Sequence, residues 1–430
     1  MTRAHFDLEQ AWAGNVPSHW RWSRNKELLA ESLSVSPEGT EELLSVSHLT
    51  GITPRSEKNV TMTAAESLDG YRLVDAGDLV INTMWAWMGA LGVSKQAGIV
   101  SPAYGVYRPR PNAAFCPGFY DYLYRSTPYV MEMTRLSRGI WSSRLRIYPD
   151  VFLSMAIPVP PLEEQRAIAD YLDRETSRID TLIEEQQRLI EMLRERQAAA
   201  ISGAVARGLN EGVALKDSGL PGAGPVPGHW DVVPLRYTIT FQEGPGIMAA
   251  DFRDDGIPLL RVSSVRTARS TLEGCNYLDP NEVDRRWSHF RVELGDLLIS
   301  ASASMGTVSE VTEETAGAVP YTGIIRIRPG RMCKEFIRWF VVSGEFIDQV
   351  NSLKTGSTIQ HFGPTHLAQM RVALPPIDEQ LRIAAYLDGE AAKISRLIAE
   401  SERLIELSKE RRDALITAAV TGQIDVREAA

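Results

Sequence analysis

The stretch that decides the fold is Pro160-Pro161-Leu162-Glu163-Glu164-Gln165. It returns half of the 430-residue chain later as Pro375-Pro376-Ile377-Asp378-Glu379-Gln380. The likeness continues at the same offset, so that Arg-Leu-Ile-Glu at 188–191 returns at 403–406. An internal repeat of this size indicates a chain that is built twice on one plan. We therefore expect one task that is carried out twice, at two places in the molecule.

Each Pro-Pro copy predicts a long amphipathic helix. Proline at a helix start, followed by acidic residues in the first turn, is a typical N-terminal signal. Apolar residues then recur at three- and four-residue steps, from Ile168 to Leu193 in the first copy and from Ile383 to Ile416 in the second. Each helix should run for roughly 40 residues, about 60 Å. An isolated helix of this length needs a partner for its apolar stripe, so we expect the two copies to pack on each other as a coiled coil.

The remaining segments have the pattern of short strands, at 43–47, 78–81, 258–262 and 296–299. These segments also repeat, but more weakly. Val-Pro-Ser-His-Trp at 16–20 returns as Val-Pro-Gly-His-Trp at 226–230, and Gly-Asp-Leu-Val-Ile at 77–81 returns as Gly-Asp-Leu-Leu-Ile at 295–299. Gly and Pro are frequent at 219–228, which predicts a linker into the second half.

The predicted fold class is α+β, a mixed α/β chain. Two globular domains are separated by two long antiparallel helices that form a coiled coil, with internal pseudo-twofold symmetry. The predicted boundaries are 1–157 for the first globular domain, 158–212 for the first spacer helix, 213–372 for the second globular domain and 373–430 for the second spacer helix.

The net charge of −9 lies mostly in the repeated helices. Segments 158–212 and 373–430 hold 7 basic against 11 acidic residues and 8 against 11, whereas 1–157 and 213–372 hold 15 against 15 and 16 against 18. A near-neutral domain can still concentrate positive charge on one face. Arginine outnumbers lysine by 38 to 8. This bias suits bidentate contacts to guanine and phosphate, and a GC-rich genome would explain it equally well.

Composition also bears on the compartment. No apolar run approaches the 18 or so residues of a membrane span, and residues 1–20 lack a charged-then-apolar signal pattern. Cys116, Cys275 and Cys333 are odd in number and far apart. This argues against disulfides or a zinc site, and it favours incidental thiols in a reducing cytoplasm.

Several enzyme classes lack their motifs. The dipeptide Gly-Lys is absent, which excludes a Walker A loop. No Glu stands two residues before a Lys, so one half of a common nuclease metal site is missing. Neither Pro-Pro pair belongs to an Asn/Asp-Pro-Pro-aromatic loop of an amino-methyltransferase. His361 and His366 are the only histidines close together, and turn or surface positions explain them better than a metal site.

Several loops and strand ends carry the residue types of a nucleic-acid interface: cations, hydroxyls, aromatic rings and small residues. Two Trp two residues apart, at 85 and 87, would share one face of an extended chain, where they would contact bases or fill a core. For the other loops the alternative is an ordinary solvated loop. The candidate contacts are Ser47, His48, Arg55, Asn82, Trp85, Trp87, Arg138, Ser142, Ser143 and Arg144 in the first globular segment, and Arg261, Ser263, Arg266, Ser300, Ser302, Ser304, Lys354, Thr355, Ser357, Thr358, Gln360 and His361 in the second.

Taken together, these features resemble the specificity subunit of a type I restriction–modification system. The Pro-Pro helix starts resemble that family's repeated central and distal regions. The stretches 77–81, 98–104, 295–299 and 355–358 resemble its two target-recognition domains. The likeness covers nearly the whole chain. In one departure, Arg-Gly-Ile-Trp at 138–141 lacks the Gly-Ser-Thr that stands at 356–358.

The resemblance implies a non-catalytic DNA-recognition subunit, in which each target-recognition domain binds one half of a bipartite, asymmetric site in double-stranded DNA. The helices would set the half-site spacing and dock two methyltransferase subunits, and restriction–translocase subunits would join them. S-adenosylmethionine, ATP and magnesium would be bound by those partners, and we expect no cofactor or metal on this chain. Two other interpretations stay open: a coiled-coil scaffold that joins two protein-binding domains, and an enzyme in its own right, which the missing motifs disfavour.

Overall fold

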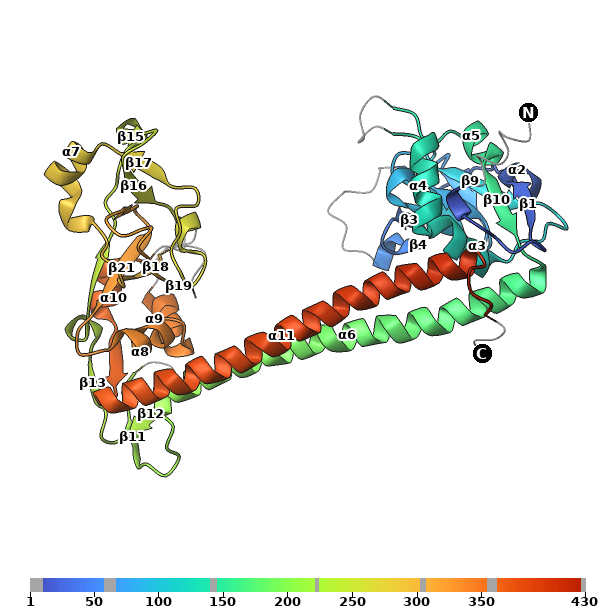
Figure 1. Ribbon diagram of the computed structural model, residues 1–430. Coiled ribbons are helices and arrows are strands. Elements are labelled where there is room, and N and C mark those ends of the chain that lie inside the picture. Colours follow the sequence, from blue (N-terminus) through green and yellow to red (C-terminus); the bar gives the residue numbers. More distant parts are fainter. Residues whose placement is uncertain are drawn as a thin grey trace. The chain divides into compact units, whose positions relative to one another are not determined.

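A computed structural model describes residues 11–57, 67–139, 145–220, 224–301, 307–353 and 362–426 (Figure 1). Its contacts divide the chain into two compact units. Unit 1 is Met1–Gln187 with Glu402–Ala430, and unit 2 is Arg188–Ser401. Each unit contains one globular domain and one half of each long helix, because the division falls inside both helices.

The globular part of unit 1 is centred on an antiparallel sheet with the strand order β2-β9-β6-β7. All three residues of β6 are buried, since both faces of the sheet are covered. Leu79 and Ile81 enter the main core, and Val80 between them enters a smaller core with the outlying strands. The strands are β1 (Arg21–Arg24), β2 (Leu29–Glu31), β3 (Leu44–Ser47), β4 (Gly51–Pro54), β5 (Arg72–Val74), β6 (Leu79–Ile81), β7 (Leu91–Val93), β8 (Gly98–Val100), β9 (Gly105–Pro109) and β10 (Ala156–Val159).

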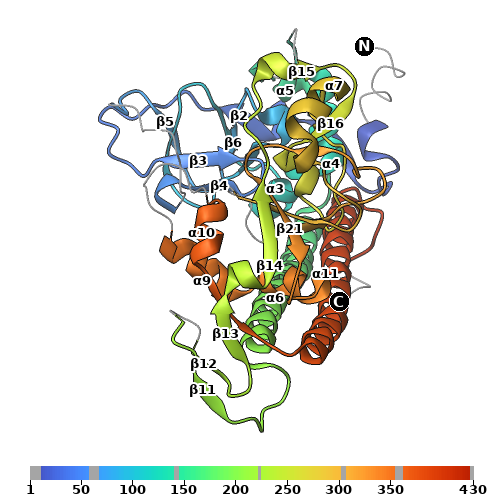
Figure 2. The same ribbon diagram turned by 90° about the vertical axis from the view of Figure 1, so that its left-hand side faces the viewer.

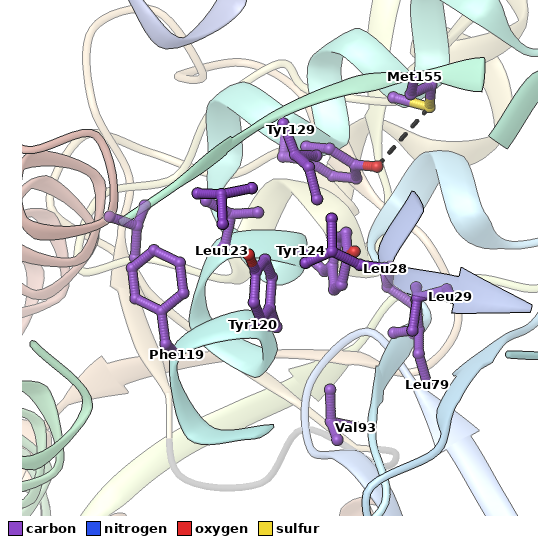
Figure 3. Close-up of a cluster of buried hydrophobic side chains, with 14 of the residues drawn as sticks. Leu28, Leu29, Leu79, Val93, Phe119, Tyr120, Leu123, Tyr124, Tyr129 and Met155 are labelled. Atoms are coloured by element: carbon purple, nitrogen blue, oxygen red, sulfur yellow. Dashed lines mark hydrogen bonds between the residues drawn. The ribbon is translucent and has the colours of Figure 1, made fainter. Parts of the chain in front are cut away.

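Aromatic side chains fill the main core of unit 1 between the sheet and its helices (Figure 3). The buried Asn25 amide organises them: its Nδ2 donates to Tyr129 Oη at 2.9 Å, and its Oδ1 accepts from Tyr124 at 2.8 Å. The Tyr129 hydroxyl also lies 3.8 Å from the Met155 sulfur. The helices are η1 (Ala11–Ala13), α2 (Asn25–Leu28), η2 (Arg55–Glu57), η3 (Ala86–Met88), α3 (Pro117–Arg125), α4 (Thr127–Leu136) and α5 (Pro149–Ser154).

Unit 2 repeats this sheet as β14-β21-β18-β19 and adds a second four-stranded sheet, β15-β17-β16-β20. The second sheet and α7 (Pro280–Glu282) lie at the end of unit 2 that is remote from the hairpin β11–β12 (Figure 2). The strands are β11 (Leu215–Asp217), β12 (Pro225–Pro227), β13 (Asp231–Pro234), β14 (Ile239–Glu243), β15 (Phe252–Arg253), β16 (Ile257–Leu260), β17 (Asn276–Leu278), β18 (Leu297–Ser300), β19 (Val308–Glu310), β20 (Val319–Pro320), β21 (Ile324–Pro329) and β22 (Arg371–Leu374).

All four strands expected from the sequence are therefore present, as β3, β6, β16 and β18. The expected linker at 219–228 is partly wrong, because Pro225–Pro227 form β12 and pair with β11. Proline is tolerated there because the two strands form a sheet with no further neighbours. The helices of unit 2 are η5 (Leu235–Tyr237), η6 (Ala249–Asp251), η7 (Val262–Val265), α7 (Pro280–Glu282), η8 (Val283–Trp287), η9 (Ser288–Phe290), α8 (Lys334–Phe340), α9 (Gly344–Leu353) and α10 (Pro364–Gln369).

The two long helices are α6 (Leu162–Arg207) and α11 (Ile377–Val420), 46 and 44 residues long. Each begins directly after its Pro-Pro pair, as the sequence predicts. Within unit 1, Ile168 of α6 shares the main core with Ile416 of α11, and Asp180 pairs with Arg412 at 3.0 Å. Along these contacts the residue numbers increase on α6 while they decrease on α11, so the two helices are antiparallel.

The same pairing recurs within unit 2. Ile201 of α6 shares the core with Ile383 of α11, and Arg196 faces Glu390 at 3.9 Å. Most of each apolar stripe is therefore covered by the partner helix and by the globular domain, whereas Leu397 and Leu404 stay partly exposed. This packing confirms the antiparallel coiled coil in each unit.

A buried glutamine fixes the start of each long helix to its globular domain. Gln165 Oε1 accepts from the Cys116 amide at 2.8 Å, and its Nε2 donates to the Pro160 and Ala114 carbonyls at 2.9 and 3.0 Å. Gln380 makes the same three bonds, from the Cys333 amide at 2.7 Å and to the Pro375 and Arg331 carbonyls at 2.9 and 3.1 Å. The repeated Gln is thus a structural residue, since a buried amide must find partners.

The His-Trp repeat holds the helix ends. In unit 1 His19 bonds Glu164 at 2.9 Å, and in unit 2 His229 bonds Glu379 at 2.6 Å. Each motif also meets the other helix where it ends at a left-handed glycine. A Cβ on Gly422 would lie 2.3 Å from Pro17, and one on Gly208 would lie 3.1 Å from the Trp230 ring. Each motif therefore clamps the start of one helix and the end of the other.

Candidate nucleic-acid interface

Asn82 contacts Tyr104 in unit 1, and Arg55 influences the same phenol through its charge. Asn82 follows β6, is buried, and donates from Nδ2 to Tyr104 Oη at 3.1 Å. Burial raises the pKa of the Tyr104 phenol, and the Arg55 guanidinium nearby opposes this. The Asn82 amide thus orders the loop that follows β6, and Arg55 places positive charge beside it.

The loop with two tryptophans is not extended, so the expectation that both rings share one face is wrong. Residues 86–88 form the 3-10 turn η3, which directs the two rings differently. Trp85 is 50% exposed. Trp87 is half-buried and donates from Nε1 to the Met84 carbonyl at 3.0 Å. Trp85 is therefore the ring that remains available for a base or a sugar.

Ser47 and His48 lie apart from Arg55. They form the turn between β3 and β4, whereas Arg55 follows the opposite end of β4. The Ser47 hydroxyl accepts from the Leu49 amide at 3.2 Å, which orders this turn. His48 is exposed and lines a cavity of about 410 Å³ with Arg125 of α3 and Arg412 of α11. The structure thus divides the first group of candidates between two places on unit 1.

Arg138 is the first residue of the candidate segment 138–144. Its backbone pairs with that of Arg146 through two hydrogen bonds of 2.9 Å, and both arginines are exposed. This bridge places two cations at the base of the loop. Ser142, Ser143 and Arg144 lie outside the described residues, so their proposed contacts stay predictions.

In unit 2, Arg261 is the candidate with the most defined surroundings. Its guanidinium lies over the Tyr321 ring, 4.1 Å from the ring centre, and 5.8 Å from the centre of the Phe252 ring. The Ser263 hydroxyl donates to the Glu273 carbonyl at 2.9 Å, which holds the turn that follows. Arg266, at the end of this turn, is exposed.

Ser300 ends β18 and is buried, 3% exposed. Its neighbour Ala301 donates its amide to the Gly323 carbonyl at 2.8 Å, and Tyr321 donates to the Leu260 carbonyl at 3.0 Å. The turn at 321–323 therefore links the end of β18 to Arg261. The remaining candidates of this unit, Ser302, Ser304, Lys354, Thr355, Ser357, Thr358, Gln360 and His361, lie outside the described residues.

The aspartates of the Gly-Asp repeat bind arginines of neighbouring strands. Asp78 binds Arg108 through two bonds of 3.0 and 2.8 Å, and Asp296 binds Arg328 through two of 2.7 and 2.9 Å. These bonds raise the pKa of both guanidinium groups. Because the carboxylates are buried, the pairs join neighbouring strands and leave both arginines committed to the fold.

The sequence interpretation missed Tyr104 and Tyr321, the rings that contact the candidates Asn82 and Arg261. A signal for them exists: residues 102–105 read Pro-Ala-Tyr-Gly and residues 320–323 read Pro-Tyr-Thr-Gly. Both turns lead into the corresponding strands β9 and β21, each next to a candidate loop. A Pro and a Gly three residues apart with a Tyr between them therefore mark equivalent turns in the two units.

Within the described ranges, no group of three or more His, Cys, Asp or Glu side chains is arranged to hold a metal ion. Among the same residues, no helix is long and apolar enough to cross a membrane. The three cysteines are half-buried free thiols.

The chain is similar to specificity subunits of type I restriction enzymes. It is 23% identical over 284 residues to the MjaVIII specificity subunit of Methanocaldococcus jannaschii, covering 64% of each protein. It is 23% identical over 214 residues to the EcoKI specificity subunit of Escherichia coli K12, covering 47% of this chain and 45% of that one. The matches thus span less than two thirds of the length of these relatives. No family model matches the chain.

Solved structures show the same fold. The HsdS subunit from Thermoanaerobacter tengcongensis matches with a TM-score of 0.57 at 18% identity, over 95% of this chain and 98% of that one. A chain from a study of complex assembly and conformational transition in the type I R-M system matches with a TM-score of 0.73 at 16% identity, over 95% of this chain and 100% of that one. The resemblance drawn from the sequence is confirmed in sequence and in fold.

Proposed function

We propose that this chain is the non-catalytic DNA-specificity subunit of a type I restriction–modification complex. Each globular domain would bind one half of a bipartite, asymmetric site in double-stranded DNA. One observation carries the proposal: the same His–Glu and Gln–backbone bonds fix a long helix to the globular domain in each unit, whereas the strand-end loops of the two domains differ in sequence. Equivalent frames with unlike surfaces suit the reading of two unlike half-sites.

The helices would dock two methyltransferase subunits, because their outer faces keep apolar side chains in solvent. Met192 of α6 is 52% exposed, and Leu397 and Leu407 of α11 are 46% and 43% exposed. Exposed apolar side chains on a helix surface can form a protein-binding face. Adenine methylation with S-adenosylmethionine, and ATP- and magnesium-dependent translocation and cleavage, would belong to the partner subunits, and the assembled complex would act on DNA in the cytoplasm.

The central test is co-expression of the full chain with its cognate methyltransferase subunits, in a host without adenine methylation. Long-read sequencing of the host genome should show methylated adenines in one motif of two unlike parts with a fixed gap. Methylation at a contiguous motif, or none above the background of the methyltransferase alone, would contradict the proposal.

The spacer role has its own test. An insertion of four residues, about one turn, near Arg194 of α6 and at the facing position of α11 should change the gap between the half-sites. The half-sites themselves should not change, because the clamps and loops are untouched. An unchanged gap in a complex that still methylates would show that the helices do not set the spacing.

The near-neutral charge of the globular segments favours one alternative, a scaffold that joins two protein-binding domains without DNA. The two functions differ in their response to salt. Phosphate contacts release counterions, so the affinity of a DNA-reading complex falls steeply with salt concentration and differs between genomic fragments. Weak binding that is equal for all fragments would favour the scaffold.

A further inference from the structure

We infer that Arg261 reads a guanine in the half-site that unit 2 binds. The inference rests on the proposed function and deepens it, because it assigns one base contact to one side chain. Three observations carry it: the placement of Arg261 by two strands, the aromatic rings beneath its guanidinium, and the hydrogen-bond donors that the fold leaves unused.

The backbone around Arg261 is fixed by strand pairing. β16 and β20 are parallel, with Leu259 opposite Val319 and Leu260 opposite Pro320. The next residue of each strand is therefore a neighbour of the other, which places Arg261 beside Tyr321. Behind Arg261, the chain turns into η7, where the Arg261 amide donates to the buried Ser264 hydroxyl at 3.2 Å. The position of the side chain is thus set by regular structure and does not depend on a free loop.

Two rings hold the guanidinium in place. It lies 4.1 Å from the centre of the Tyr321 ring and 5.8 Å from that of Phe252, and the two rings are 6.5 Å apart. Such cation–π contacts restrict a side chain that is otherwise among the most flexible. A planar guanidinium that is already ordered loses less entropy when it binds.

The fold leaves most of the donors of Arg261 unused. A guanidinium has five N–H donors, and within the described residues one hydrogen bond is formed, to Asn276 Oδ1 at 3.4 Å. No carboxylate of the described residues pairs with it, whereas Arg328 of β21 is paired with Asp296 and Glu293. Arg328 is therefore used by the fold, and Arg261 keeps a charged, unpaired fork.

An ordered fork with free donors matches the O6 and N7 acceptors of guanine in the major groove. It also matches a phosphate, but the two uses have different consequences. A phosphate contact strengthens binding to every sequence equally, whereas a guanine contact strengthens binding to one base. The rings favour the base contact, since they fix the plane of the fork, and a phosphate contact requires no fixed plane.

The chain offers a matched control. Arg236 also lies over a tyrosine, 4.9 Å from the centre of the Tyr237 ring, and is exposed. It follows β13, outside the sheet that carries Arg261, and bonds the Ala368 carbonyl at 2.9 Å. Arg236→Ala therefore removes an arginine–tyrosine stack of similar geometry without touching the proposed contact.

The test compares the wild type with Arg261→Ala, Tyr321→Leu and Arg236→Ala, each as the full chain with its methyltransferase subunits. Methylated adenines are mapped in the host genome, and affinities are measured for duplexes in which each guanine of the motif is replaced in turn. In Arg261→Ala, one guanine position in one half-site should become degenerate, with a loss of discrimination of about tenfold to a hundredfold. Tyr321→Leu should lose part of this discrimination between bases, and Arg236→Ala should keep all of it.

Three results would overturn the inference. They are an unchanged motif in Arg261→Ala, an equal loss of affinity for all duplexes, or a motif without guanine in either half-site. Thermal melting of each variant shows whether unit 2 is still folded. Arg236→Ala and Tyr321→Leu lie in the same unit as Arg261→Ala, so their melting temperatures serve as the reference. Failure of the proposed function would appear separately, as a wild-type complex that methylates no bipartite motif.

Discussion

Replacement of Gln380 by alanine tests whether the buried glutamine holds α11 to unit 2. Gln380 is 1% exposed and makes three hydrogen bonds to backbone groups of two segments. The substitution removes all three and leaves the Cys333 amide and the Arg331 carbonyl without this partner. At about 1 kcal/mol net for each bond, the free energy of unfolding should fall by about 3 kcal/mol. The cavity left by the side chain adds to this loss.

For a unit of about 200 residues, 1 kcal/mol corresponds to a shift of about 2–4 °C in the melting temperature. Gln380→Ala should therefore lower the melting transition of unit 2 by about 6–12 °C. Differential scanning calorimetry suits the measurement, since it separates transitions in a chain that need not unfold in two states. Gln369→Ala is the matched control, because Gln369 of α10 lies in unit 2 and is exposed, and its replacement should cost less than about 0.5 kcal/mol.

Gln165→Ala extends the test to unit 1, where the same three bonds are made. Because the two glutamines share no partner, their effects should add in the double variant to within about 0.5 kcal/mol. A Gln380→Ala transition within 1–2 °C of the wild type, about the shift expected for an exposed residue, would refute the reasoning. It would show that water or a local rearrangement replaces the amide at little cost.

Three further predictions follow from charged groups. Burial raises the pKa of Glu345 to about 7. The stability that comes with its protonated form is therefore fully present below the ordinary pKa of 4.5, and it is lost as the pH rises towards 7. Glu345→Gln should melt at a higher temperature than the wild type at pH 8 and at the same temperature at pH 4. Burial opposes ionisation of Glu379, but hydrogen bonds from Trp230 and His229 outweigh it and lower the pKa of the Glu379 carboxyl. The stability that the ionised carboxylate contributes is present above pH 4.5 and is lost as the pH falls through the lowered pKa. Glu379→Gln should therefore melt at a lower temperature than the wild type at pH 7, with a smaller difference at pH 3. Asp296→Asn removes the negative charge that pairs with Arg328, and the free energy of unfolding measured in urea should fall by about 2–3 kcal/mol. The loss is smaller than for a fully buried ion pair because Arg328 is partly exposed. Asp254→Asn, at an exposed aspartate, is the control.

The long helices could be predicted from the sequence because their signals are local. Proline, acidic residues and an apolar period of three and four residues lie next to one another in the chain, and the repeat supplied the partner for each stripe. The same holds for the strands at 43–47, 78–81, 258–262 and 296–299, where a short apolar run is bounded by turn residues. In these segments the local preference and the tertiary structure agree.

The candidate site was predicted less well, because its geometry depends on residues far apart in sequence. Whether Arg261 is a free fork or a structural ion pair depends on Tyr321 and on whether a carboxylate pairs with it, which none does among the described residues. Neither feature can be read from the segment around Arg261. The two tryptophans show the same limit. Their spacing suggested an extended chain, and the turn η3, which packs on α4 through the Thr134 hydroxyl, separates the rings.

The internal repeat distinguishes residues of the frame from residues that are free to differ. Interactions at the helix starts recur even where the residue type changes: Tyr122 bonds Asp173 at 2.8 Å in unit 1, and Trp339 bonds Asp388 at 3.1 Å at the corresponding place in unit 2. At the strand ends the residue types diverge, with Asn82 in one unit and Ser300 in the other, next to equivalent Tyr-containing turns. Two unlike half-sites require this combination, because a shared frame keeps both loop surfaces in the same local geometry while the side chains on them vary. The differences between the units therefore indicate the recognition surface better than their similarities do. In unit 2 this surface includes Arg261, a described residue whose guanidinium donors are mostly unused by the fold.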